Sequence, residues 1–173
     1  IRLLFTKLIC IFAKIKENME NLGYKVYNKH IAFWGSPLSN FYPCEFELDN
    51  EIWNCSEQFF MACKARCFDD YDSYKKIRVA TTPEQAKKLG RKVVGFEDRI
   101  WDKVKYQLMF DGVYAKFSQN ESLKEFLLSP KFEGKDFVEG SPFDGVWGVK
   151  MDYRNKDIDN PENWNGENLL GKV

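Results

Sequence analysis

Two segments near the start of the chain carry the hydrophobic patterns of strands. His30-Ile31-Ala32-Phe33-Trp34 is an almost uninterrupted apolar run, which predicts a buried strand. From Cys44 to Leu48 apolar residues alternate with acids, and the chain returns through Ile52-Trp53 after a turn at Asp49-Asn50. We therefore expect a buried strand followed by a short hairpin.

After Asn54 the apolar spacing becomes that of helices. Residues 54–68 leave scarcely any polar face, which predicts a helix enclosed by the fold. Thr82-Pro83-Glu84-Gln85 has the form of a capping box with proline at the first helical position, and Gly90 ends that helix. Residues 100–117 predict a longer helix, and residues 122–128 predict another that ends at Ser129-Pro130.

Helices thus dominate, with strands expected near residues 30–54 and 136–150. The sequence has no internal repeat and no long linker, and its 173 residues fit one domain. The fold class that we predict is α+β, as a single compact, mainly helical domain with a small β-sheet.

Residues 1–18 differ from the rest, because they hold four basic residues and no acid before Glu17. Their apolar stretch is far shorter than the roughly 20 residues of a membrane span. Three interpretations stay open: a basic targeting leader, a surface helix, or translated sequence upstream of a start at Met19. We expect residues 1–18 to be a leader or upstream extension outside the core, and residues 19–173 to form the domain.

Composition narrows the function classes. Lys plus Arg equals Asp plus Glu at 26 each, so no net charge draws the chain to duplex DNA or to an anionic membrane. The five cysteines include no C-x-x-C pair, which predicts reduced thiols, no metal site and a cytoplasmic location, with organellar targeting by residues 1–18 as an alternative. The single histidine, His30, disfavours a His-centred triad. The 15 Phe, 8 Tyr and 5 Trp could fill a core or stack on a flat ring.

Glu57 and Lys64 are the first candidate pair for chemistry. Seven residues apart on a helix, they project within about 20° of each other with roughly 10 Å of rise between them. Since helical side chains lean toward the N-terminus, we expect Lys64 to reach back toward Glu57. The alternative is structural: Asn54 caps the helix, Glu57 is the capping-box acid, and Lys64 extends to water.

Asp144 and Trp147 form the second candidate pair. They lie in the Gly- and Pro-punctuated stretch from Glu139 to Gly148, which predicts a loop beside a strand. Loops carry function more often than core does. Asp144 could instead cap backbone N–H groups and Trp147 could be core, just as Asn168 could cap the last helix.

Six blocks of sequence then follow one another in order: Ser39-Asn40-Phe41, Glu57 to Met61 with Lys64-Ala65, Trp101 to Met109, Lys116 to Asn120, Glu139 to Gly148, and Trp164 to Gly171. In this order and spacing the chain resembles the NADAR, or YbiA-like, N-glycosidase family, from about Phe33 to its C-terminus. Any single block is a weak signal, whereas the ordered set is a strong one.

The resemblance implies a compact α+β enzyme that cleaves N-glycosidic bonds. Members of the family act on ribosylated pyrimidine intermediates of riboflavin biosynthesis, and others remove ADP-ribose from guanine in nucleic acid. By position, the implied catalytic residues are Glu57, Lys64 and Asp144, and the substrate-binding residues are Trp147, Asn40, Phe41, Trp34, Asn168 and Trp101. Two departures stand out: Val149 replaces a usual second Gly, and the chain ends before the family's last apolar and basic residues.

Breaking a ribose C1′–N bond requires stabilising an electron-poor carbon and protonating the leaving base, tasks that Glu57 and Asp144 can share. Lys64 offers a second route, attacking C1′ of the ring-opened sugar to form an imine. Trp147, with Phe41 or Trp34, would stack on the base. No cofactor is expected, and the partner is a nucleotide-like small molecule or ADP-ribosylated guanine, with no membrane and no obligatory protein partner. The alternative function is a non-catalytic module that binds ADP-ribose or a related nucleotide.

Overall fold

A computed structural model describes residues 22–173, so the expected extension at residues 1–18 lies outside the described residues. The elements run in the order β1 (Tyr24–Val26), β2 (His30–Phe33), β3 (Phe46–Leu48), β4 (Glu51–Trp53), α2 (Ser56–Cys67), α3 (Tyr71–Arg78), α4 (Pro83–Gly90), α5 (Asp98–Gln119), α6 (Glu121–Leu127), η1 (Pro130–Phe132), β5 (Asp136–Glu139), η2 (Lys156–Asp159), η3 (Pro161–Asn163) and α7 (Leu169–Lys172). This is the mainly helical α+β architecture that the sequence predicts.

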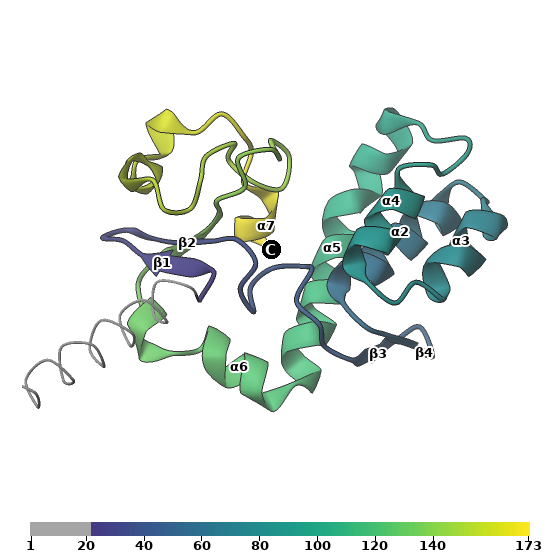
Figure 1. Cartoon of the computed structure of the whole chain (residues 1–173), viewed down its shortest axis with the longest axis horizontal. Helices are drawn as coiled ribbons and strands as arrows, with labels where there is room; N and C mark the ends of the chain where they lie inside the picture. Colours follow the sequence, from purple (N-terminus) through teal and green to yellow (C-terminus); the bar gives the residue numbers. More distant parts are fainter. Residues whose placement is uncertain (1–21) are drawn as a thin grey trace, which may run out of the picture.

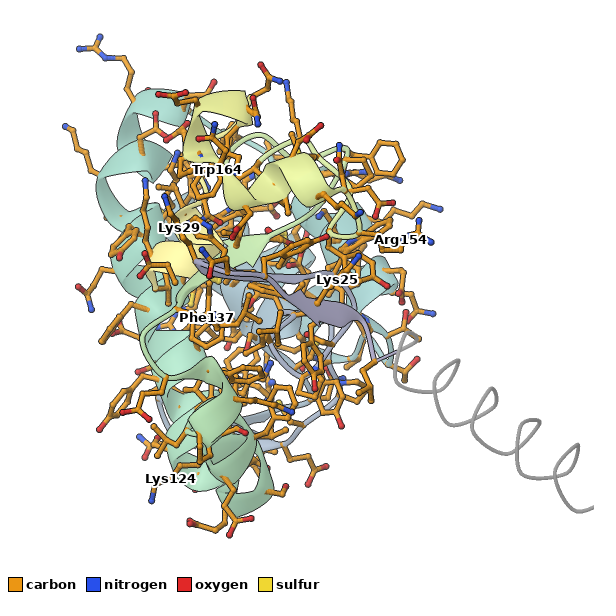
Figure 2. All side chains as sticks on the ribbon, turned by 90° about the vertical axis from the view of Figure 1, so that its left-hand side faces the viewer. Lys25, Lys29, Lys124, Phe137, Arg154 and Trp164 are labelled. Atoms are coloured by element: carbon orange, nitrogen blue, oxygen red, sulfur yellow. The ribbon has the colours of Figure 1, made fainter. Side chains whose placement is uncertain are left out.

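In Figure 1 the molecule has two halves: α2, α3, α4 and α5 gather in one, and the sheet with the C-terminal segment forms the other. Figure 2 shows Trp164 and Lys124 of α6 toward opposite ends of the view, with Phe137 of β5 between them. Within residues 22–173 no helix combines the length and the apolar character that crossing a membrane requires.

The main sheet has the order β1-β2-β5, with β2 antiparallel to β1 and parallel to β5. The predicted buried strand is confirmed, because all four residues of β2 are buried. The predicted hairpin is confirmed as β3 and β4, which form a separate two-stranded sheet. Of the expected strand region 136–150, only residues 136–139 form a strand, and the Gly- and Pro-rich remainder is loop.

The two faces of the main sheet contact different cores. Ile31 and Phe33 belong to the large core that the helices cover, and Phe137 packs against it. Ala32 and Val138, which lie opposite each other in the ladder, belong to a smaller core beneath the C-terminal segment. Since side chains in register point to the same face, Glu139, opposite Phe33, points to the helical side of the sheet.

The helix predictions hold except at one cap. Thr82 caps α4 as expected, accepting a hydrogen bond from the Gln85 N–H. The structural alternative for α2 is wrong, because the cap is Cys55, whose Sγ accepts from the Gln58 N–H at 3.4 Å, and not Asn54. Gln58 then takes the capping-box position that was expected for Glu57, since its Oε1 accepts from the Asn54 N–H at 3.0 Å. Glu57 is therefore not needed as a capping residue.

Candidate active site

The candidate site lies at the carboxyl ends of the parallel strands β2 and β5. In parallel sheets these ends lie at one edge, where ligands of α/β proteins also bind. Trp34 follows β2 there, and the loop from Gly140 follows β5. The Trp34 and Phe143 rings meet edge to face, with centroids 6.2 Å apart, so the two chain segments lie side by side.

Glu57, the second residue of α2, belongs to this region. Its N–H donates to the Asn40 carbonyl at 3.0 Å, and the residue is only 5% exposed. Burial raises the pKa of the Glu57 carboxyl from 4.5 to about 7. The positive charges of Lys87 and Arg91 oppose this rise, and the negative charge of Asp144 adds to it. The sequence-predicted acids Glu57 and Asp144 are thus brought together.

Glu139 is a third carboxyl group of the site, one that the sequence reasoning passed over. It ends β5 on the helical face of the sheet, where burial raises its pKa from 4.5 to about 8. Asp144 and Glu57 raise that pKa further, and Lys87 lowers it. The sequence signal for Glu139 was an acid at the position that pairs with Phe33, on a sheet face that is otherwise apolar. This signal can be recognised only when β2 is known to pair with β5.

Asp144 is held by its own loop. Its Oδ1 accepts hydrogen bonds from the N–H groups of Val146 and Trp147, both at 2.9 Å, and its N–H donates to the Ser141 hydroxyl. The backbone-capping role that the sequence left open therefore exists. It coexists with an electrostatic role, because the Asp144 charge acts on both Glu57 and Glu139.

Lys87 of α4 supplies positive charge beside these acids. Its ammonium lies 5.2 Å from the centroid of the Phe41 ring. Its charge acts on Glu57 and Glu139, whereas Arg91, which follows α4, acts on Glu57. The sequence analysis did not select Lys87, because no local pattern distinguishes it from Lys88.

Lys64 is not directed toward Glu57 as expected. Its Nζ lies 3.8 Å from the centroid of the Phe96 ring, and Asp98 is the charge that acts on it. The attraction to the face of Phe96 and to Asp98 accounts for this orientation. Burial nonetheless lowers the pKa of the Lys64 amine. The structure therefore brings together Glu57 and Asp144, and it places Lys64 beside Phe96.

Two of the predicted aromatic residues meet through Phe60. The Trp101 ring lies tilted against Phe60 at 4.9 Å, and the Trp147 ring meets it edge to face at 5.1 Å. Trp101 is 7% exposed, whereas Trp147 is half-buried. Trp34 is 41% exposed and Phe41 is half-buried. A flat ligand therefore has exposed ring surface at Trp34 and partial access to Phe41 and Trp147.

The two predicted asparagines are buried and hydrogen-bonded. Asn168 spans the edge of β5: its Oδ1 accepts from the Glu139 N–H at 3.0 Å, and its Nδ2 donates to the Phe137 carbonyl at 2.9 Å. Asn168 stands at the N-cap position of α7, as the capping alternative expected, but its side chain makes no hydrogen bond to that helix. Asn40 donates from Nδ2 to the Met109 sulfur at 3.0 Å and accepts from the Glu57 N–H through its carbonyl.

Unpaired buried polar atoms gather at this site. Across residues 22–173, the buried side-chain atoms without a hydrogen-bond partner are Asn40 Oδ1, Ser56 Oγ and Glu139 Oε2. Ser56 adjoins Glu57, and Asn40 binds its backbone. Buried polar groups without partners cost free energy and are uncommon outside functional sites. Over the same residues, no group of three or more His, Cys, Asp or Glu side chains has an arrangement suited to a metal ion.

Comparison with known proteins agrees with this geometry. A family model described as NADAR domain matches residues 27–173. The chain is 42% identical over 119 residues to the N-glycosidase R617 of Acanthamoeba polyphaga mimivirus, with 68% of each chain covered. It is 31% identical over 137 residues to the chloroplastic riboflavin biosynthesis protein PYRR of Zea mays, covering 72% of this chain and 21% of that protein.

The fold is also similar to a solved structure. The NMR structure of the Escherichia coli protein YbiA matches with a TM-score of 0.66 at 27% identity, covering 88% of this chain and 84% of that one. The family model spans the elements from β2 to α7 and includes Glu57, Glu139 and Asp144. The chain therefore belongs to the NADAR domain family.

Proposed function

We propose that this NADAR-family N-glycosidase hydrolyses the bond between ribose C1′ and the base of a ribosylated or ADP-ribosylated base. The names of its relatives support the reaction class, since one is called an N-glycosidase and another a riboflavin biosynthesis protein. The substrate is accordingly either a ribosylated pyrimidine intermediate of that pathway or ADP-ribosylated guanine in nucleic acid. The cysteines among the described residues are free thiols: Cys44, Cys55, Cys63 and Cys67. Free thiols are consistent with the cytoplasmic location that we propose.

The observation that carries the proposal is the convergence of a buried carboxyl group with a second one that is fixed by its loop. Burial raises the pKa of Glu57 to about 7, so Glu57 can exchange a proton during the reaction. Asp144 is fixed in place by two backbone N–H donors. Its negative charge can stabilise the electron-poor C1′ as the base departs. Glu57 then takes the proton of the attacking water.

The aromatic residues supply the surface for the base. Base–aromatic stacking is worth about 1–3 kcal/mol per base in single-strand binding proteins. Trp147 lies within the loop that Asp144 caps, so a base stacked on it has its glycosidic bond near the acids. Phe41, beside Lys87, and the exposed Trp34 offer further ring surface.

Lys64 supports a second route to the same products. Its amine has a lowered pKa, so a larger share of it is uncharged near neutral pH. An uncharged amine can add to C1′ of a ring-opened ribose while C1′ is still joined to the base nitrogen. The C1′–N bond to the base then breaks, the base leaves with a proton, and the remaining imine between Lys64 and C1′ is hydrolysed by water. This route requires Lys64 to leave the face of Phe96.

Release of free base tests the proposal against the binding-module alternative. The chain is incubated with nucleosides, nucleotides, riboflavin precursors and an ADP-ribosylated guanine oligonucleotide, and bases are separated by chromatography. We expect release from at least one probe and a loss of that release in Asp144→Asn. Calorimetric binding of ADP-ribose with no base released from any probe would instead support the module.

A further inference from the structure

We infer that Glu139 is the general acid of this site: its carboxylic acid gives a proton to the leaving base while Glu57 receives a proton from water. The inference rests on the proposed hydrolysis and assigns a residue to its proton-donating step.

The backbone of Glu139 is fixed on every side. Its N–H donates to Asn168 Oδ1 at 3.0 Å, and its carbonyl accepts from the Val149 N–H at 3.1 Å. The following N–H, of Gly140, donates to the Phe33 carbonyl at 2.8 Å. These bonds use main-chain atoms, so they would form with any residue at position 139. The acid is not required to hold β5 in place.

The side chain of Glu139, in contrast, has no hydrogen bond to the described residues. Its Oε2 is buried without a partner, and its position in the ladder turns it toward the helices that carry Glu57 and Lys87. A buried carboxyl group without a partner is costly when it is ionised and much less so when it is neutral. A neutral carboxyl also has a hydroxyl group that can donate to a ligand.

The charged groups that face Glu139 determine how firmly it keeps its proton. Burial is the largest influence and raises the pKa of Glu139, and Asp144 and Glu57 raise it further. Lys87 is the group that lowers it, and the resulting pKa is about 8. Glu57, with Lys87 and Arg91 acting to lower its pKa, titrates at about 7. Two positive charges, those of Lys87 and Arg91, act on Glu57, whereas Lys87 is the one that acts on Glu139, so Glu139 holds its proton more firmly than Glu57 does.

The buried, unpartnered carboxyl oxygen of Glu139 and the two positive charges that act on Glu57 assign the two halves of the reaction. The C1′–N bond breaks, its electron pair goes to the base nitrogen, and the Glu139 proton neutralises the departing base. A water oxygen forms the new bond to C1′, and the proton that the water loses goes to the Glu57 carboxylate. Glu57 then returns its proton to solvent and Glu139 regains one, so the free base and the hydroxylated sugar are the only net products.

Glu139→Gln tests the assignment, because glutamine keeps the size and a hydrogen-bond donor but has no proton to give. With a probe from which the wild-type chain releases base, we expect kcat to fall about 10²–10⁴-fold. KM and the melting temperature should stay near their wild-type values. The wild-type rate should decline above pH 8 as Glu139 ionises. The matched control is Glu133→Gln, an exposed acid in the turn before β5, which should retain wild-type kcat.

A second measurement needs no turnover. In protein labelled with ¹³C at glutamate carboxyl carbons, one resonance should titrate near pH 8 and be missing in Glu139→Gln. A resonance that titrates below about pH 5, as ordinary glutamates do, would overturn the inference. So would a folded Glu139→Gln variant with wild-type kcat. A wild-type chain that releases no base from any probe would instead overturn the proposed function and, with it, the reaction step.

Discussion

At the scale of single residues, the site gathers acids where their ionisation is opposed. Glu57 and Glu139 are buried on elements that come from different parts of the chain, and each has a raised pKa. Asp144 has two effects: it caps its own loop, and its charge raises the pKa values of the two glutamates. In enzymes, buried acids with raised pKa values often serve catalysis at a cost to the stability of the folded state, so the proposed roles predict distinctive mutational effects.

Glu57→Gln should lose activity and gain stability at alkaline pH. The folded chain holds the Glu57 proton up to about pH 7, whereas the unfolded chain releases it near pH 4.5, so this contribution to stability is lost as pH rises through 7. Glutamine removes that dependence. At pH 8 we expect the variant to be more stable by about 1–3 kcal/mol.

Near pH 4.5 Glu57→Gln and the wild type should unfold at similar denaturant concentrations, and turnover should fall about 10²–10⁴-fold at the pH optimum. Denaturant unfolding at the two pH values and a base-release assay measure these effects. The control is Glu125→Gln on the exposed side of α6. A variant that is destabilised at pH 8 yet active would return Glu57 to a structural role.

Lys64 distinguishes the imine route from direct hydrolysis. Its amine has a lowered pKa but lies against Phe96. If the imine forms, borohydride added during turnover should leave a sugar adduct on Lys64, detectable by peptide mass spectrometry. Lys64→Arg should then be inactive, because arginine cannot form the imine, and Lys88→Arg should retain activity. An active Lys64→Arg chain without adduct would leave hydrolysis to the acids.

At the scale of elements, the spacing of apolar residues predicts individual helices and strands. It does not predict which strands pair when they are far apart in the sequence. The β2 strand, the β3–β4 hairpin, α4, α5 and α6 follow from apolar spacing and caps. Helix α3 was not predicted, and of its eight residues only Ile77 is buried. The pairing of β2 with β5 joins residues about a hundred positions apart, and no local pattern encodes it. Glu139 was not predicted as a site residue for that reason. The direction of the Lys64 side chain was predicted wrongly because Phe96, which it contacts, lies on another segment.

Asn168 should act on the site through β5. Asn168→Gly keeps the left-handed backbone, whose φ is 53°, but removes both hydrogen bonds to the strand. We expect a loss of about 1–3 kcal/mol in unfolding free energy, because a buried donor and acceptor lose their partners. We also expect kcat to fall more than KM rises, because Glu139 is no longer held in place.

Chemical unfolding and steady-state kinetics check the Asn168 prediction. Asn165→Gly is the control, since that exposed side chain has no hydrogen bond to the described residues and its loss should change neither quantity. An Asn168→Gly chain with wild-type stability would show that the amide does not secure the strand.

At the scale of the whole molecule, the family match begins at residue 27. We therefore expect residues 1–18 to be dispensable, and a chain that begins at Met19 to fold and to release base as the full chain does. Circular dichroism melting and the base-release assay compare the two. An insoluble or inactive shortened chain would show that the extension takes part in the domain.

The parallel pairing of β2 with β5 has a consequence for biosynthesis. Residues 34–135, which include all of α2 to α6, lie in the sequence between two strands that are neighbours in the sheet. A ribosome that has released only the helical half has delivered Glu57 and Lys87 but neither Glu139 nor Asp144. Contacts between residues so far apart in sequence also form slowly. With the roles proposed for Glu139 and Asp144, the nascent chain gains glycosidase activity only after both residues have been synthesised.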